Sequence, residues 1–241
     1  MSAPDVPDDF TVSLWAADPL VANPVVFWPD QSGRVFVCES YRQETKGVPD
    51  NRAYQYWTED DLRCMTVDDR AEMYLRHHPE YAEEWTREEE RIMLLEDRNH
   101  DGFADHSQVF ADGFNELLDG TGAGVLVRQK ADGGSEAWYA CIPHLWKLED
   151  RDGDGVAEQR TSLHRGYGVR VALRGHDMHG LQIGPDGMLY FSIGDRGYAV
   201  ETTEGEVLSN PGSGAVFRCN LDGSGLELFC VGLRNPQELC F

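Results

Sequence analysis

The chain contains an internal repeat, and no other feature restricts the folds open to it so strongly. The segment 95–105, LEDRNHDGFAD, returns 53 residues later as 148–158, LEDRDGDGVAE. Two further landmarks keep a similar spacing: 56 residues separate Gly124 from Gly180, each followed by apolar residues, and 58 separate Leu181 from Leu239. A period of about 55 residues indicates a supersecondary unit that must stack on its neighbours to bury a core.

Short apolar runs bounded by tight turns fill most of each repeat. Val35-Phe36-Val37 follows Ser32-Gly33, and Leu189-Tyr190-Phe191 follows Asp186-Gly187, as in β-hairpins. The hairpins are spaced too regularly, with too few helices between them, for a doubly wound α/β sheet. Repeats of four short strands are typical of β-propeller blades, with a solenoid as the alternative, and the antiparallel hairpins favour the propeller.

One segment breaks this pattern. Residues 58–90 are rich in Glu, Arg, Met, Leu and Ala, and Thr58 and Thr66 precede acidic residues at positions suited to helix N-caps. We expect a helical insertion here. Its charged run at 83–91 has the pattern of a solvated helix face, to which we assign no chemistry.

Composition excludes several kinds of partner. The 43 acidic and 21 basic side chains give a net charge of −22, which opposes binding of nucleic acid or of an anionic membrane surface. No apolar run approaches the roughly 18 residues of a membrane-spanning helix, so we expect no direct membrane insertion. The acidic N-terminus lacks the hydrophobic stretch of a signal peptide.

The six cysteines show no metal or haem motif. They form no CxxC, no CxxCH and no zinc-like spacing, so structural zinc and covalent haem are not encoded in these residues. Several lie in apolar runs, where free cysteine behaves as a small buried hydrophobe. Pairing of Cys219 with Cys230 across a hairpin is left open.

The two copies of the repeated loop carry oxygen ligands at alternate positions, as calcium requires. The second copy offers Asp150, Asp152, Asp154, the Val156 carbonyl and Glu158. The first offers Asp97, Asn99, Asp101, the Phe103 carbonyl and Asp105. Neither has a Glu at position twelve, where Gln108 and Thr161 stand, so neither is an EF-hand. The alternative is an Asp/Gly-rich turn that binds nothing.

Two stretches resemble a known enzyme family. Residues 175–197, GHDMHGLQIGPDGMLYFSIGDRG, and 232–237, GLRNPQ, are similar to parts of the soluble quinoprotein glucose dehydrogenases and aldose sugar dehydrogenases. These are six-bladed propellers that bind pyrroloquinoline quinone (PQQ) and calcium. The resemblance implies that His176, five residues before Leu181, is the general base for a sugar hydroxyl, and that Arg234 and Asn235 contact the quinone.

A closer resemblance covers nearly the whole chain. The opening Trp15-Ala16-Ala17-Asp18-Pro19-Leu20, the strand at 33–37, the insertion, the repeated loops and Pro143-His144-Leu145-Trp146 are similar to the N-terminal propeller of large planctomycete membrane-bound dehydrogenases. Complete members often continue with helical repeats and a CxxCH haem segment. The resemblance therefore implies a c-type haem domain of the full-length chain as electron acceptor, and a periplasmic or extracellular location.

The chain also departs from the sugar dehydrogenase pattern. Gly175 stands where that family carries an acid, and Asp177 follows the histidine instead. His179 is a second candidate for the base. Further residues that could line the same mouth are Arg170, Asp195 and Arg196, although Asp195 and Arg196 could form a loop ion pair.

The fold expected for residues 1–241 is all-β: about half of a six-bladed β-propeller with a helical insertion at 58–90. Without the insertion, about 190 residues remain, which is three to three and a half units of about 57 residues. A closed ring needs about twice that number, so we expect a domain truncated at its C-terminal end.

The expected function is oxidation of a sugar or related alcohol by a PQQ-dependent dehydrogenase. Two alternatives stay open: a non-catalytic propeller that binds a glycan or a protein, and a calcium-dependent lactonase in which the metal activates water. No GxSxG motif and no phosphate-binding loop is present, so an activated serine and a nucleotide cradle are excluded.

Overall fold

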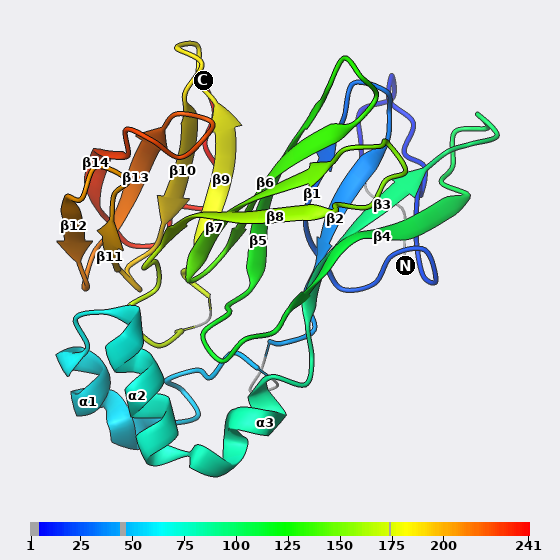
Figure 1. Ribbon diagram of the computed structural model, residues 1–241. Coiled ribbons are helices and arrows are strands. Elements are labelled where there is room, and N and C mark those ends of the chain that lie inside the picture. The colour runs from blue at the N-terminus through cyan, green and yellow to red at the C-terminus, as the bar shows by residue number, and fades with distance from the viewer. Residues whose placement is uncertain (1–4, 44–46, 174) are drawn as a thin grey trace.

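A computed structural model describes residues 5–43, 47–173 and 175–241. The strands form four antiparallel sheets, none of which closes on itself (Figure 1). The first sheet has four strands in the order of the chain: β1 (Pro24–Pro29), β2 (Val35–Glu39), β3 (Glu90–Glu96) and β4 (His106–Phe114). The predicted all-β class is therefore confirmed.

The second and third sheets repeat this arrangement. The second contains, in order, β5 (Gly122–Gln129), β6 (Ser135–Cys141), β7 (His144–Asp150) and β8 (Gln159–Arg165). The third contains β9 (Met178–Ile183), β10 (Leu189–Ile193), β13 (Gly214–Cys219) and β14 (Glu227–Leu233). A separate hairpin of β11 (Tyr198–Glu201) and β12 (Val207–Asn210) is inserted between β10 and β13.

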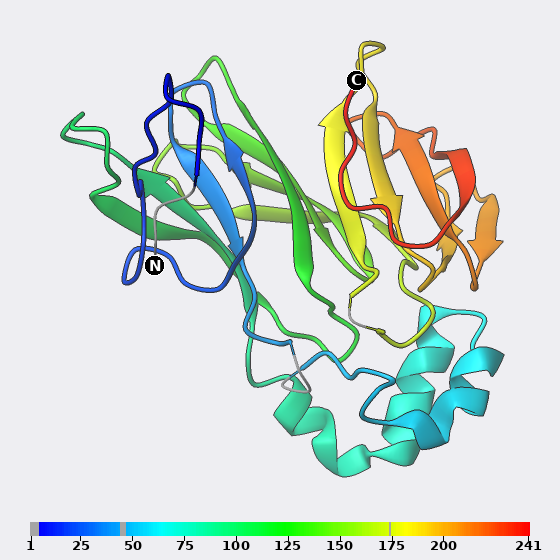
Figure 2. The same ribbon diagram turned by 180° about the vertical axis from the view of Figure 1, so that it is seen from behind.

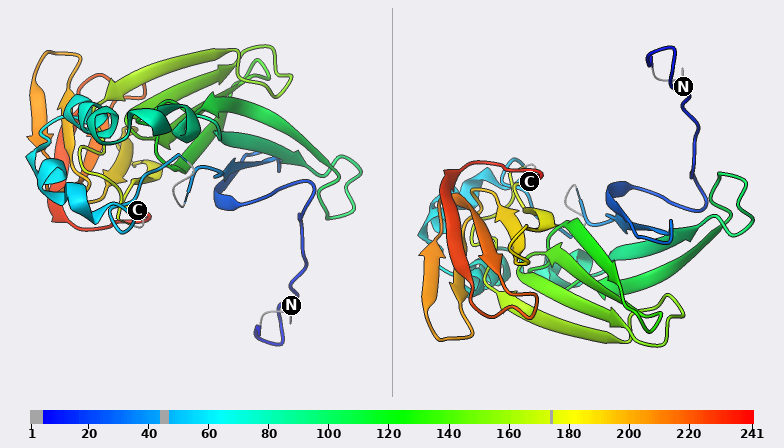
Figure 3. Two further views of the ribbon diagram at one scale, coloured as in Figure 1. Left: turned by 90° about the horizontal axis from the view of Figure 1, so that it is seen from below. Right: turned by 90° about the horizontal axis from the view of Figure 1, so that it is seen from above.

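The three large sheets follow one another in an arc (Figure 3). Their first strands are neighbours, since β1 contacts β5 and β5 contacts β9. One apolar core lies between the first and second sheets, where Phe36 and Phe110 meet Tyr139. A second core lies between the second and third sheets, where Trp138 meets Phe191. The central sheet thus buries both faces, because alternate side chains of a strand point to opposite sides.

Strand pairing separates the two ends of the sheets. The pairs Pro24/Glu39, Gly122/Cys141 and Met178/Ile193 lie at one end, which we call the cap end because the helices lie there (Figures 1 and 2). The opposite end carries the short turns between first and second strands, together with the repeated loops 97–105 and 151–158. The two longest connections, the helical insertion and the segment between β10 and β13, therefore lie at the cap end, together with the two-residue turn between β6 and β7.

The helical insertion connects β2 to β3. Its elements are η1 (Gln55–Trp57), α1 (Thr58–Arg63), α2 (Val67–His77), η2 (Pro79–Tyr81) and α3 (Ala82–Trp85). Its buried side chains, including Trp57, Tyr74 and Trp85, pack against Val169 and Val171 beside the third sheet. The predicted insertion is confirmed, although the helices start slightly before residue 58 and end before residue 90.

The two predicted N-caps have different outcomes. Thr66 begins α2 with a capping box, in which its hydroxyl accepts from the Asp69 amide and the Asp69 carboxylate accepts from the Thr66 amide. The prediction for Thr58 is wrong: it is the first residue of α1, and its hydroxyl donates to the Gln55 carbonyl at 2.6 Å.

The charged run at 83–91 is not a solvated helix face, because the helix ends at Trp85 and β3 begins at Glu90. Glu90 is completely buried. One carboxylate oxygen accepts from the Ser40 hydroxyl and the Tyr41 and Arg42 amides, and the other accepts from the Gly122 amide at 2.9 Å. Burial still raises the pKa of Glu90. This carboxylate therefore links the start of the insertion to the second sheet.

Only some of the cysteines are buried as the apolar runs around them predict. Cys38, Cys64, Cys141 and Cys219 are buried, whereas Cys230 and Cys240 are exposed. Burial of Cys230, expected from its apolar run, is wrong because β14 is the exposed last strand of its sheet. Cys219 and Cys230 are both free thiols. Among the described residues, no helix has the length and apolar character needed to cross a membrane.

Candidate functional site

His176 lies at the cap end, two residues before β9 begins. Its backbone is left-handed, with φ of 68°, and Gly175 before it has φ of 89°. A left-handed backbone is unfavourable for a histidine, so the surrounding contacts must stabilise it there. Gly194 is one such contact: a Cβ added to it would lie 2.6 Å from the His176 carbonyl oxygen. The absence of a side chain at residue 194 therefore lets the two segments approach.

The imidazole of His176 is oriented by Asp195. Its Nδ1 lies 2.5 Å from Asp195 Oδ1, and the histidine side chain is 6% exposed against 38% for the aspartate. Because a carboxylate can only accept, this contact assigns a proton to Nδ1, and in the neutral imidazole Nε2 is then an acceptor. A carboxylate-oriented histidine of this kind is suited to act as a general base.

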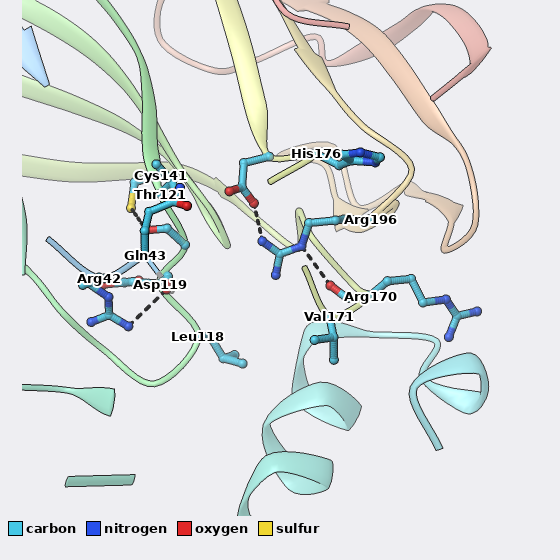
Figure 4. A network of polar contacts seen from close by, with 12 residues as sticks. Arg42, Gln43, Leu118, Asp119, Thr121, Cys141, Arg170, Val171, His176 and Arg196 are labelled. Atoms are coloured by element: carbon cyan, nitrogen blue, oxygen red, sulfur yellow. Dashed lines mark hydrogen bonds and ion pairs between the residues drawn. The ribbon is translucent and has the colours of Figure 1, made fainter. Parts of the chain in front are cut away.

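A second pair joins the same two segments. Arg196, directly after Asp195, forms a buried ion pair with Asp177, directly after His176 (Figure 4). Arg196 Nε also donates to the Arg170 carbonyl at 2.9 Å. The alternative of an ion pair between Asp195 and Arg196 is therefore wrong: each residue pairs with the segment 176–177 instead.

The residues predicted to contact a quinone lie next to this pair. The Asp195 amide donates to the Arg234 carbonyl at 2.7 Å. The Arg234 side chain is exposed, and the half-buried Asn235 accepts from Gln237 Nε2 at 2.9 Å. The structure thus brings His176, Asp195 and Arg234, which are far apart in sequence, to one place at the cap end.

His179, the second candidate for the base, has a different environment. It lies in β9, and its Nδ1 is 3.1 Å from the Ala123 carbonyl of the neighbouring sheet. Burial lowers the pKa of His179, with the His176 ring as a smaller contribution in the same direction. These contacts tie His179 to packing between sheets, and within the described part of the chain no carboxylate forms a hydrogen bond with it.

The buried polar groups around Asp119 carry no recognisable pattern in the sequence. This residue precedes β5, and burial raises its pKa to about 6. Its carbonyl accepts from Arg42 Nη2 (Figure 4). The same Nη2 also donates to the carbonyls of Gly47 and Glu116. Asp119 and Arg42 lie outside every recognisable motif, so only the tertiary structure reveals them.

The predicted metal ligands lie at the opposite end of the sheets from His176. In the second loop, carboxylate oxygens of Asp150, Asp152, Asp154 and Glu158 all lie within 4.8 Å of one another. Asp150 is buried, and burial raises its pKa, with Glu158 and Asp154 as smaller contributions. The Val156 amide donates to Asp154. This set of hard oxygen donors fits calcium.

The first loop has a similar backbone pattern but a different donor set. The amides of Asp101 and Gly102 donate to Asp97, and the Phe103 amide donates to Asp101. Asn99 Nδ2 donates to Asp101 at 3.1 Å, so an amide N–H faces the carboxylate. Asp105 accepts from the Arg98 amide. Among the described residues, the carboxylates of this loop do not gather as those of the second loop do.

Comparisons with known proteins give one match. Neither the curated proteins nor the solved structures contain a match to this chain. A family model described as "Domain of unknown function (DUF7133)" matches residues 1–235. Since that match spans almost the entire length, the chain belongs to the DUF7133 family.

Proposed function

We propose that the chain is part of a six-bladed propeller that oxidises the hydroxyl of a sugar or related alcohol, with PQQ as cofactor and His176 as general base. The observation that carries the proposal is the His176–Asp195 pair, located beside Arg234 at the cap end. A base, its orienting carboxylate and an exposed guanidinium are the groups that such chemistry requires.

The propeller is supported by a contact that recurs between successive units. Gly124 of β5 faces Leu181 of the third sheet, where an added Cβ would lie 3.4 Å from the leucine. Gly180 of β9 faces Leu239 in the same way, at 2.9 Å. The final segment thus lies beside β9 as β9 lies beside β5, which supports a further sheet in the same arc.

His176 and Asp195 have separate roles in the proposed proton transfer. His176 Nε2 accepts the proton of the substrate hydroxyl, and Asp195 balances the positive charge that the imidazole gains. The near-complete burial of His176 limits its contact with water. Asp195 is more exposed, so it retains contact with solvent.

The residues present fit a quinone that carries carboxylates. The exposed Arg234 guanidinium can pair with a carboxylate, and the Asn235 amide can bind a carbonyl. When bound, the quinone supplies the hydride acceptor. The family resemblance adds the remaining parts of the proposal: a c-type haem domain as electron acceptor, and a periplasmic or extracellular location.

Calcium is proposed for the second repeated loop, on its four converging carboxylates. Because this loop lies at the far end of the sheets, its metal would stabilise the fold rather than activate water beside His176. The position of the loop gives no support to a lactonase that uses this metal. Here, chelation is expected to lower the melting temperature without changing oxidation by loaded enzyme.

A titration of the full-length protein that contains this chain with PQQ in calcium buffer, followed by absorbance and tryptophan fluorescence, tests the proposal. We expect saturable binding, weakened at least tenfold in Arg234→Gln and unchanged in Arg151→Gln, an exposed arginine at the opposite end. His176→Gln should bind the quinone normally but lose sugar oxidation. Absence of saturable binding would overturn the dehydrogenase and favour a non-catalytic binding propeller.

A further inference from the structure

Two consecutive residues on one segment pair with two consecutive residues on another. We call this arrangement the double pair: His176 with Asp195, and Asp177 with Arg196. The Gly194 amide adds a backbone bond to the Asp177 carbonyl at 3.3 Å. Because the residues are adjacent, fixing Asp177 against Arg196 also fixes the spacing of His176 and Asp195.

Arg196 is held more firmly than a surface ion pair. Its side chain is 2% exposed and that of Asp177 is 1% exposed. The Arg196 backbone carbonyl accepts from the Arg170 amide at 2.7 Å, and its Nε donates back to the Arg170 carbonyl. A planar guanidinium can satisfy a carboxylate and a carbonyl at once, which a lysine ammonium cannot do in the same geometry.

The helical insertion fixes the segment that holds Arg196. Arg170 Nη1 donates to the Cys64 carbonyl at 2.7 Å and also to the Asp61 carbonyl, both at the end of α1. The Asp61 carboxylate accepts from the Val171 amide at 2.8 Å. The Asn51 amide donates to the Ala172 carbonyl at 2.9 Å. Segment 170–172 therefore bridges the insertion and Arg196.

We propose that Arg196 is a positioning residue for His176, and that the insertion holds it in place through segment 170–172. Without the Arg196 guanidinium, the Asp177 carboxylate loses its ion pair, and the 3.3 Å backbone bond from Gly194 remains as a weaker tie between the two segments. The left-handed His176 then relaxes towards ordinary backbone angles. The hydrogen bond from His176 Nδ1 to Asp195 is then lost. The link to proton transfer rests on the proposed function, whereas the effect on the imidazole does not.

Long-range ¹H–¹⁵N NMR of the histidine-labelled chain reads the imidazole directly. His176 is assigned by the signal lost in His176→Gln. We expect the Nδ1–H tautomer in the wild type, and a mixture with at least tenfold faster exchange of that proton in Arg196→Lys. Asp61→Asn should act in the same direction but less, because one of its carboxylate acceptors becomes a donor.

Arg42→Lys is the matched control. Arg42 is an equally buried guanidinium at the cap end, but it donates to carbonyls outside the double pair. It should leave the His176 signals unchanged. Equal disturbance by Arg42→Lys, or an unchanged tautomer in folded Arg196→Lys, would overturn the proposal.

A second variant guards against misfolding. Asp177→Asn combined with Arg196→Gln removes both charges of this ion pair together, so neither member is left charged without the other. It should fold and still show the mixed tautomer; a wild-type His176 signal in this variant also contradicts the proposal. Wild-type protein with the expected tautomer but no oxidation would reject the proposed function while leaving the role of Arg196 intact.

Discussion

The two candidate histidines at the cap end have the same sequence context but different hydrogen-bond partners. His176 and His179 lie three residues apart, in one motif, and both lie at the start of the third sheet. His176 faces a side-chain carboxylate, whereas His179 faces a backbone carbonyl. The motif alone identifies the pair of candidates, but the choice between them depends on Asp195, which lies 19 residues further along the chain.

Gly194→Ala should disturb His176 directly. The added Cβ would meet the His176 carbonyl oxygen at 2.6 Å and its Cβ at 2.8 Å, and both belong to a tightly held segment. We expect a loss of about 1–3 kcal/mol in the free energy of unfolding, as for other overpacked sites. Urea denaturation measures it. Gly212→Ala, where no atom lies within 4 Å, is the control and should change stability by less than about 0.5 kcal/mol; an equal loss in both would contradict the expectation.

Asp119→Asn tests a pH dependence. Its pKa of about 6 in the folded protein exceeds the value of about 3.9 for an unfolded chain, so the folded state binds the proton more tightly. The contribution of this group therefore falls as pH rises from about 4 to about 6, and stays low above that. The neutral amide should remove this fall and stabilise the protein at pH 7.5 by about 3 kcal/mol at most.

Denaturation of both proteins between pH 4 and pH 8 gives the comparison. Asp132→Asn, at an exposed turn, is the control and should follow the wild type. A variant less stable than the wild type at pH 7.5 would show instead that the Asp119 carboxylate is charged and favourably paired in the folded state.

At the scale of elements, the sequence predicted the features that depend only on residues close together in the chain. The capping box at Thr66 and the hairpin turns need only neighbouring residues, so they could be predicted. Glu90 could not, because its partners Ser40 and Gly122 are about 50 and 32 residues away. A run of charges has the same appearance whether its last members continue a helix or enter a buried strand.

The two repeated loops allow a calcium prediction at this scale. Calorimetry should detect one site in the wild type, lost in Asp152→Asn, because one of the four gathered carboxylates becomes an amide. Asn99→Asp supplies the first loop with the carboxylate that the second loop has at the equivalent position, and should raise the stoichiometry towards two. No heat in the wild type would reject the site, and an unchanged stoichiometry in Asn99→Asp would reject the comparison between loops.

At the scale of the whole molecule, the repeat predicted sheets that stack in series, and three such sheets are present. The number of sheets in a closed ring cannot be predicted from the sequence of one repeat, since it depends on the angle between neighbouring sheets. The two outer sheets of the arc keep apolar side chains in solvent: Phe27 is 66% exposed on the first, and Phe229 is 58% exposed on the third. Large exposed apolar groups at the ends of a stack are typical of surfaces that contact another partner.

The exposed ends should make this 241-residue chain associate at high concentration. Phe229→Ser together with Val231→Thr should lower the association constant at least tenfold, because both side chains are exposed on β14. Sedimentation velocity over a range of concentrations measures the effect. Phe103→Ser, in the first repeated loop, is a control of similar exposure that should leave association unchanged. Equal effects of both variants would show that the ends of the arc are not the contact surface.

The position of His176 and the helical insertion at the cap end leaves the opposite end of the sheets available for engineered attachments. Gly33 and Gly187 lie in exposed turns at the opposite end, where an added Cβ meets no atom within 4 Å. Exposed turns of this kind tolerate inserted sequence. A fluorescent reporter or a surface-immobilisation tag inserted there would leave the double pair and the insertion untouched, so the protein could be tethered to an electrode or bead with its cap end facing outward.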